Sequence, residues 1–190
     1  MPTTVPPRRI LAAIAAPLLM AITALGTPTA SHAASPPCAA TTVAAGQAPA
    51  TTVGRAVRCL VNAQRAAHGL APLRPSRQLR LAAEAHGADM VSHRFFAHVS
   101  PFSGAVTDRV RRAGYLAHRE DWALGEDIAW GEGSLSTPES IVTAWMNSPA
   151  HRAVILDGDF RDAGVGVIAG VPVDDDSMPG ATFVLDVGVR

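Results

Sequence analysis

The sequence predicts an α+β domain in which helices come first along the chain and an antiparallel sheet follows. Between about residues 53 and 113, apolar side chains recur at the three- and four-residue spacing of amphipathic helices. In the C-terminal third, residues 163–168 and 181–187 are short apolar runs separated by a polar turn at Asp174–Asp176, a pattern typical of paired strands. Helices followed by strands indicate α+β layers rather than an alternating parallel arrangement.

Three helices are expected in the first part of the domain. The first spans about residues 53–68 and ends before Gly69. Ser76 is the expected cap of the second helix, and a third covers about residues 105–113. One stripe of the second helix carries Leu79, Ala82, Ala83, His86, Met90 and His93, so its two histidines are expected in the core.

Two further helix starts carry a cap followed by proline. Thr137-Pro138 opens a fourth helix, and Ser148-Pro149 opens a short fifth one that carries His151. Between the third and fourth helices, residues 125–130 are a candidate for one more short strand.

The N-terminus predicts export. Residues 1–33 combine Arg8 and Arg9, an uncharged run over residues 10–25 and the small-residue site Ser31-His32-Ala33, which together indicate a signal peptide. The alternative, a membrane anchor, is disfavoured because the apolar run is short for a bilayer and contains Pro17. We therefore expect a secreted, extracellular protein with no membrane span after cleavage.

The exported part is expected to hold one domain. Residues 34–50, rich in Ala, Pro and Thr, are predicted to be a linker, and residues 51–190 the folded domain. The two cysteines, Cys38 and Cys59, are expected to form a disulfide, since exported cysteines usually pair. The alternative, two ligands of a metal site, is disfavoured because their spacing fits no zinc pattern.

The composition of the sequence disfavours or excludes several classes of function. The 190 residues carry a formal net charge of zero, which disfavours a nucleic-acid partner. All 16 basic residues are arginine, so lysine Schiff-base chemistry is excluded. The sequence also lacks the HExxH, GxSxG and P-loop patterns of common catalytic sites.

Three side chains are candidates for a functional site: His98, Glu126 and His151. Imidazoles and a carboxylate can bind a divalent transition metal or exchange protons with a substrate. Each also has a structural interpretation. His98 can cap the end of the second helix, His151 can hydrogen-bond within its own helix turn, and Glu126 can pair with an arginine. His68 and His118, at loop edges, are expected to be solvated.

Five motifs in order resemble the CAP superfamily (SCP-like domains), in its bacterial secreted branch. The resemblance covers about residues 57–189. The motifs are Leu60-Val61-Asn62-Ala63-Gln64-Arg65; Ala88-Asp89-Met90 with Phe95-Phe96-Ala97-His98; Gly125-Glu126-Asp127-Ile128-Ala129; Trp145-Met146-Asn147-Ser148-Pro149-Ala150-His151-Arg152; and Gly164-Val165-Gly166-Val167.

The resemblance implies an α-β-α sandwich with a central antiparallel sheet, and a cleft where two His and two Glu meet, often around Zn²⁺ or another divalent cation. His98, Glu126 and His151 match three of those four residues. Ser148 stands where the second Glu would fall, and Asp127 replaces the usual Asn, so both are candidates to line the cleft. With three matching residues, the cation is expected to bind weakly.

Two functions are compatible with these expectations. We favour a binding module that holds a metal ion or a small apolar or lipid-like ligand, because no nucleophile with an activating partner is visible. The alternative is a metal-assisted hydrolase acting on cell-wall or protein substrates, with Glu126 as its catalytic general base. A third hypothesis is a secreted structural or interaction domain with a vestigial cleft.

Overall fold

The computed structural model describes residues 38–117, 121–173 and 178–190, all within one compact unit, Ser35–Arg190. The predicted signal peptide, His118 and the Asp174–Asp176 turn lie outside the described residues. In chain order the elements are α1 (Ala50–Ala67), β1 (Arg74–Pro75), α2 (Arg77–His93), α3 (Val106–Arg112), β2 (Ala123–Glu132), the 3-10 helix η1 (Gly133–Ser136), α4 (Pro138–Asn147), α5 (Pro149–Ile155), β3 (Asp162–Ala169) and β4 (Gly180–Val189).

The sheet has four strands in the order β1-β3-β4-β2. Strands β2, β4 and β3 are antiparallel, as expected, and β2 is an outer strand. At the opposite edge, the two residues of β1 pair with β3 in parallel, which makes the sheet mixed. Neither β1 nor η1 was expected from the sequence, because two and four residues are too short for a periodic pattern.

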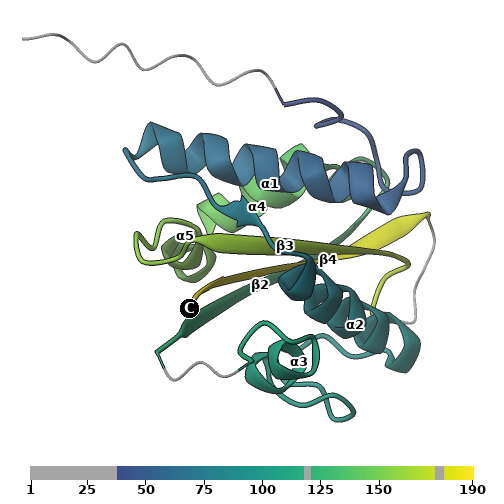
Figure 1. Ribbon diagram of the computed structural model, residues 1–190. Coiled ribbons are helices and arrows are strands. Elements are labelled where there is room, and N and C mark those ends of the chain that lie inside the picture. Colours follow the sequence, from purple (N-terminus) through teal and green to yellow (C-terminus); the bar gives the residue numbers. More distant parts are fainter. Residues whose placement is uncertain (1–37, 118–120, 174–177) are drawn as a thin grey trace, which may run out of the picture. The chain divides into compact units, whose positions relative to one another are not determined.

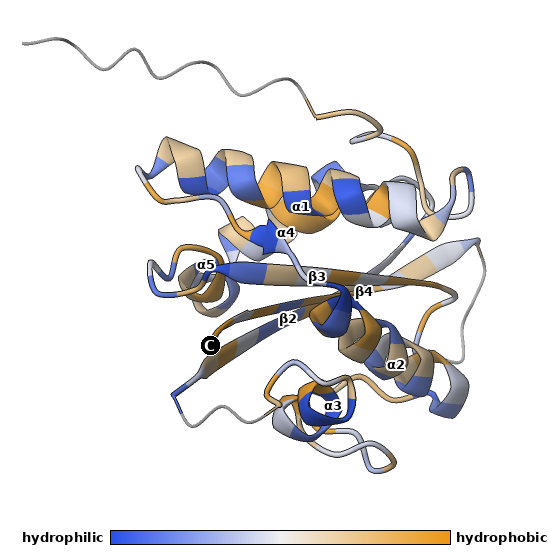
Figure 2. Ribbon diagram, in the orientation of Figure 1, coloured by the Kyte–Doolittle hydropathy of each residue, from blue (hydrophilic) through white to orange (hydrophobic). Residues whose placement is uncertain are grey.

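Helices cover both faces of the sheet. Figure 1 shows α1 and α4 on one side of the strands and α2 and α3 on the other. The α1 side packs a large apolar cluster that includes Val57, Trp145, Ile155 and Phe183. Figure 2 shows hydrophobic residues along much of β3 and β4, whereas α1 and α2 mix hydrophobic and hydrophilic residues. This is the three-layer α+β arrangement that the resemblance implied.

Helix α2 lies directly on β3, and glycine makes that approach possible. A Cβ atom on Gly164 would lie 2.0 Å from the Arg80 nitrogen, and one on Gly166 would lie 2.5 Å from the Ala83 carbonyl carbon. The alternating residues of β3, Val165 and Val167, face the core on the other side. The Gly-Val-Gly-Val motif therefore sets how closely the second helix covers the sheet.

The predicted caps of the second and fourth helices are confirmed, whereas α1 begins at Ala50, three residues before its predicted start. The Ser76 hydroxyl accepts a hydrogen bond from the Leu79 N–H, and the Thr137 hydroxyl accepts one from the Ser140 N–H. Ser148 occupies the cap position of α5, but its side chain makes no capping hydrogen bond.

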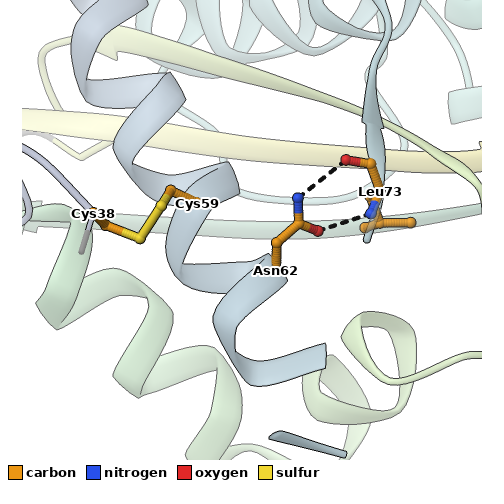
Figure 3. The surroundings of a disulfide bond; sticks show 4 residues. All are labelled: Cys38, Cys59, Asn62 and Leu73. Atoms are coloured by element: carbon orange, nitrogen blue, oxygen red, sulfur yellow. Dashed lines mark hydrogen bonds between the residues drawn. A yellow bond between two sulfur atoms is a disulfide. The ribbon is translucent and has the colours of Figure 1, made fainter. Parts of the chain in front are cut away.

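A disulfide and a few hydrogen bonds fasten the N-terminal part of the domain. The predicted Cys38–Cys59 bond is present, and Asn62, one turn further along α1, binds both the N–H and the carbonyl of Leu73 (Figure 3). Within the segment between Cys38 and α1, Ala45 is buried and its N–H donates to the carbonyl of Ser136.

Replacing both cysteines with serine should lower the free energy of unfolding by about 3 kcal/mol, because the bond closes a loop in the unfolded chain. Urea unfolding of the oxidised protein, the reduced protein and the Cys38→Ser/Cys59→Ser variant measures this. The reduced protein and the variant should agree, and equal stability of all three would contradict the expectation.

Candidate functional site

Glu126 lies in β2 and points to the α2 side of the sheet, where it is buried against Arg109 of α3. Arg109 Nη2 lies 2.5 Å from Glu126 Oε2, and the same guanidinium donates to the backbone carbonyls of His98 and Gly104. Burial alone would raise the pKa of Glu126, but the hydrogen bond from His98 and the charge of Arg109 outweigh it and lower that pKa. Glu126 is therefore an ionised carboxylate at neutral pH.

His98 joins this ion pair from the loop that follows α2. Its Nδ1 lies 2.9 Å from Glu126 Oε1, and because an ionised carboxylate only accepts, Nδ1 carries the proton. The hydrogen bond to Glu126 raises the pKa of His98, although partial burial opposes the shift. The side chain of His98 is 54% exposed, so part of the ring is open to solvent.

His151 reaches the same region from α5, which packs against β2. Its Nδ1 is buried and has no hydrogen-bond partner among the described residues. Burial lowers the pKa of His151, and the charge of His98 lowers it further. We call His98, Glu126, Arg109 and His151 the β2-edge site.

Two buried acids lie beside Glu126. Asp186 of β4 is its partner across the ladder, and burial followed by the Glu126 charge raises the pKa of Asp186 well above its ordinary value. Asp127 is fully buried, and burial raises its pKa to about 8. No described residue hydrogen-bonds to a carboxyl oxygen of Asp127. Asp127 is thus predominantly neutral at pH 7, and Glu126 carries a negative charge.

The remaining sequence candidates lie in different settings. His86 is buried, with its Nε2 3.9 Å from Glu126 Oε1, and burial lowers its pKa. The expectation of a core position was wrong for His93, which is exposed and stacks on Phe102 at 3.6 Å between ring centroids. His93 comes after the last buried turn of α2, where the helix has already left the sheet. His68 is exposed, as expected.

Arg109 is the site residue that the sequence did not reveal. It stands beside two other arginines in its segment, and nothing in that spacing marks it as the partner of Glu126. Its neighbours Arg111 and Arg112 are exposed, whereas Arg109 is 2% exposed. The sequence signal for the burial of Arg109 is its helical spacing, since Arg109 shares one face of α3 with Val106 and Val110.

The arrangement fits a metal ion only in part. Both Glu126 oxygens already accept a hydrogen bond, one from Arg109 and one from His98, so Glu126 is held as a partner of His98. Within the described ranges, no group of three or more His, Cys, Asp or Glu side chains is placed to hold a cation. His98 and His151 each offer an imidazole, and a carboxylate lies behind the first. Ser148, half-buried at the start of α5, adds only a hydroxyl.

The fold matches solved structures of extracellular bacterial proteins. An SCP-domain extracellular protein from Bacillus anthracis aligns with a TM-score of 0.56 and 27% identity, over 71% of this chain and 40% of that one. An outer surface protein from Borrelia burgdorferi aligns with a TM-score of 0.54 and 18% identity, over 70% of this chain and 90% of that one, and shows the fold alone.

Sequence relatives define the family. The family model described as "CAP: Cysteine-rich secretory protein family" matches residues 59–176, and the chain belongs to this family. The uncharacterized protein YkwD of Bacillus subtilis is 38% identical over 57% of this chain, and the uncharacterized membrane protein YlbC of the same organism is 32% identical over 62%. The matched part spans only 40% and 32% of those two relatives.

In the described part of this chain, no helix has both the length and the apolar character that a bilayer span requires.

Proposed function

We propose that this CAP-domain protein is an extracellular binding module whose β2-edge site holds a divalent cation weakly through His98 and His151. The observation that carries the proposal is the contact of His98 Nδ1 with Glu126 Oε1 at 2.9 Å. Histidines that bind metals almost always donate their other ring N–H to such a carboxylate, which orients the ring and makes it more basic. Imidazole suits Zn²⁺, Cu²⁺ and Ni²⁺.

The role of Glu126 in this proposal is to position His98. Arg109 fixes the carboxylate from behind, and the carboxylate fixes the tautomer of His98. The Nε2 lone pair then faces outward whenever His98 is neutral. A two-histidine site leaves other coordination positions to water, so we expect weaker binding than at a closed four-ligand zinc site.

The hydrolase alternative requires Glu126 to accept a proton from water. Its pKa is lowered and both its oxygens are engaged, which makes it a poor general base.

The other ligand class expected from the sequence, a small apolar molecule, would meet Phe96 and Val99. These residues flank His98 in the chain and are 44% and 61% exposed. Neither interpretation explains the orientation of His98 as directly as a cation does.

Titration of Zn²⁺ into the purified protein, followed by calorimetry, tests the proposal. His98→Ala and His151→Ala should each weaken binding at least about tenfold, and Glu126→Gln should weaken it roughly 10- to 100-fold by releasing the His98 ring. His68→Ala is the matched control, since His68 is exposed and hydrogen-bonds only locally to the Gln64 carbonyl. Equal Zn²⁺ affinity in all the variants would refute the proposal. Circular dichroism checks that each variant is folded.

A further inference from the structure

A second concave region lies at the sheet edge opposite the β2-edge site. Strand β1 pairs with β3 only at Asp162 and Ala163, so within the described residues no strand covers that side of β3 from Gly164 onward. Helices α1 and α2 approach this uncovered edge from the two faces of the sheet, and β3 runs between them (Figure 1). The space between them is a cavity of about 490 Å³.

Four arginines line this cavity, two from each helix. Arg55 and Arg58 come from α1, Arg77 and Arg80 come from α2, and no Asp or Glu is among the lining residues. We call this region the arginine groove. A quarter of the basic residues of a chain with zero formal charge are thus gathered in one place, since the sequence holds 16.

The charges of the arginine groove are largely unneutralised. Arg80 is 2.5 Å from Glu84, and in the described part of the chain it alone of the four has a carboxylate within ion-pair distance. Arg55 contacts the Thr52 hydroxyl, and Arg58 lies 3.5 Å from the Leu73 carbonyl. Burial lowers the pKa of Arg58, so holding this charge in the groove is unfavourable unless an anion joins it.

The floor of the arginine groove is apolar. It is formed by Pro75, Ala163, Gly164 and Val165, and at Gly54 the missing side chain opens it towards α1. A cavity of this size accommodates a drug-sized molecule rather than a bare ion. Several guanidinium groups together favour a doubly charged head over a single carboxylate, and their planar donors match phosphate oxygens in pairs.

We propose that the arginine groove binds a small amphiphilic phosphomonoester, with its phosphate on the guanidinium groups of α1 and α2 and its apolar body against Pro75 and the uncovered edge of β3. The groove is distinct from the β2-edge site, since the two lie at opposite edges of the sheet. The phosphate can belong to a free molecule or to a lipid headgroup, and the experiment separates these sources.

Calorimetric titration with octyl phosphate, inorganic phosphate and uncharged octyl glucoside tests the proposal on the purified chain. Octyl phosphate should bind at least about tenfold more tightly than either of the others, because only it supplies both the head and the body. The Arg55→Gln/Arg77→Gln variant should weaken its binding at least about tenfold, since both side chains are exposed and their loss spares the core.

The matched control is Arg112→Gln/Arg152→Gln, which removes the same charge from two exposed arginines outside the groove. It should keep octyl phosphate affinity within about twofold, apart from weak long-range charge effects that salt screens. His98→Ala should leave this affinity unchanged, which separates the result from the cation proposal. Equal binding by the groove variant and the control would overturn the proposal.

Co-sedimentation with phosphatidylcholine vesicles, with and without phosphatidic acid, identifies the source of the phosphate. Binding that requires both phosphatidic acid and Arg55/Arg77 supports a lipid headgroup. Binding of octyl phosphate without vesicle binding supports a free phosphomonoester. If neither octyl phosphate nor the acidic vesicles depend on these arginines, the groove is not a phosphate site.

Discussion

Replacing Arg109 with Gln should lower the free energy of unfolding by about 3 to 5 kcal/mol, the largest loss that we expect from any single substitution in the β2-edge site. Arg109 is buried, and its guanidinium serves Glu126 together with the carbonyls of His98 and Gly104. Without it, an ionised Glu126 would remain buried beside Asp186 with no arginine to offset its charge.

Urea unfolding at neutral pH measures this loss. Arg112→Gln, on the same helix but exposed, should change stability by less than about 0.5 kcal/mol. Arg109→Lys should recover only part of the loss, because one ammonium group does not reproduce the forked donors that reach three acceptors. If Arg109→Gln were as stable as Arg112→Gln, the buried ion pair would not hold the site together.

Replacing Asp127 with Asn should stabilise the protein increasingly as the pH rises. The pKa of Asp127 is raised from an ordinary 3.8 to about 8, so the folded state keeps a proton that the unfolded state has already released. Between about pH 4 and pH 8 the stability of the wild type therefore falls as pH rises, by ~1.4 kcal/mol per pH unit at most. An amide has no charge to bury and is free of this dependence.

The expected difference is near zero at pH 4 and on the order of 2 to 5 kcal/mol in favour of Asp127→Asn at pH 8, the upper end being the full linkage from the Asp127 shift. Asp159→Asn, at an exposed position, should track the wild type across this range. Urea unfolding at several pH values checks both variants. A constant gap between Asp127→Asn and the wild type would show that Asp127 is ionised in the folded protein.

The elements of the domain could be predicted where local chemistry determines them. Ser76 and Thr137 cap their helices as ordinary hydrogen-bond acceptors, and the alternation of Gly164 and Val165 marks the strand on which α2 lies. Such signals need only a few neighbouring residues. Strand β1 has no such signal, since two residues become a strand only when β3 is beside them.

Three residues of the β2-edge site could be predicted from the sequence, but Arg109 and the contacts among the four could not. His98 and Glu126 stood out in the sequence, and the structure brings them to hydrogen-bond distance. Both Glu126 oxygens accept hydrogen bonds only because the loop before α3 folds back to β2. No local sequence pattern predicts that fold-back. Asp186 was missed for the same reason, because its place opposite Glu126 is set by the register of β2 and β4.

The arginine groove could not be predicted from the count of charged residues, for the same reason. Counting residues gives a neutral chain. The gathering of Arg55, Arg58, Arg77 and Arg80 arises only when α1 and α2 approach the edge of β3 from opposite faces of the sheet (Figure 1). Net charge therefore excluded a strongly basic protein but said nothing about a local anion site.

The most direct test of the cation site is ¹⁵N NMR of the histidine rings during a Zn²⁺ titration. We expect His98 to be an Nδ1-protonated tautomer in the free neutral protein, and its Nε2 signal to shift together with the ring signals of His151 as Zn²⁺ is added. An Nε2-protonated His98, or Zn²⁺ shifts confined to other histidines such as His68 and His93, would contradict the account.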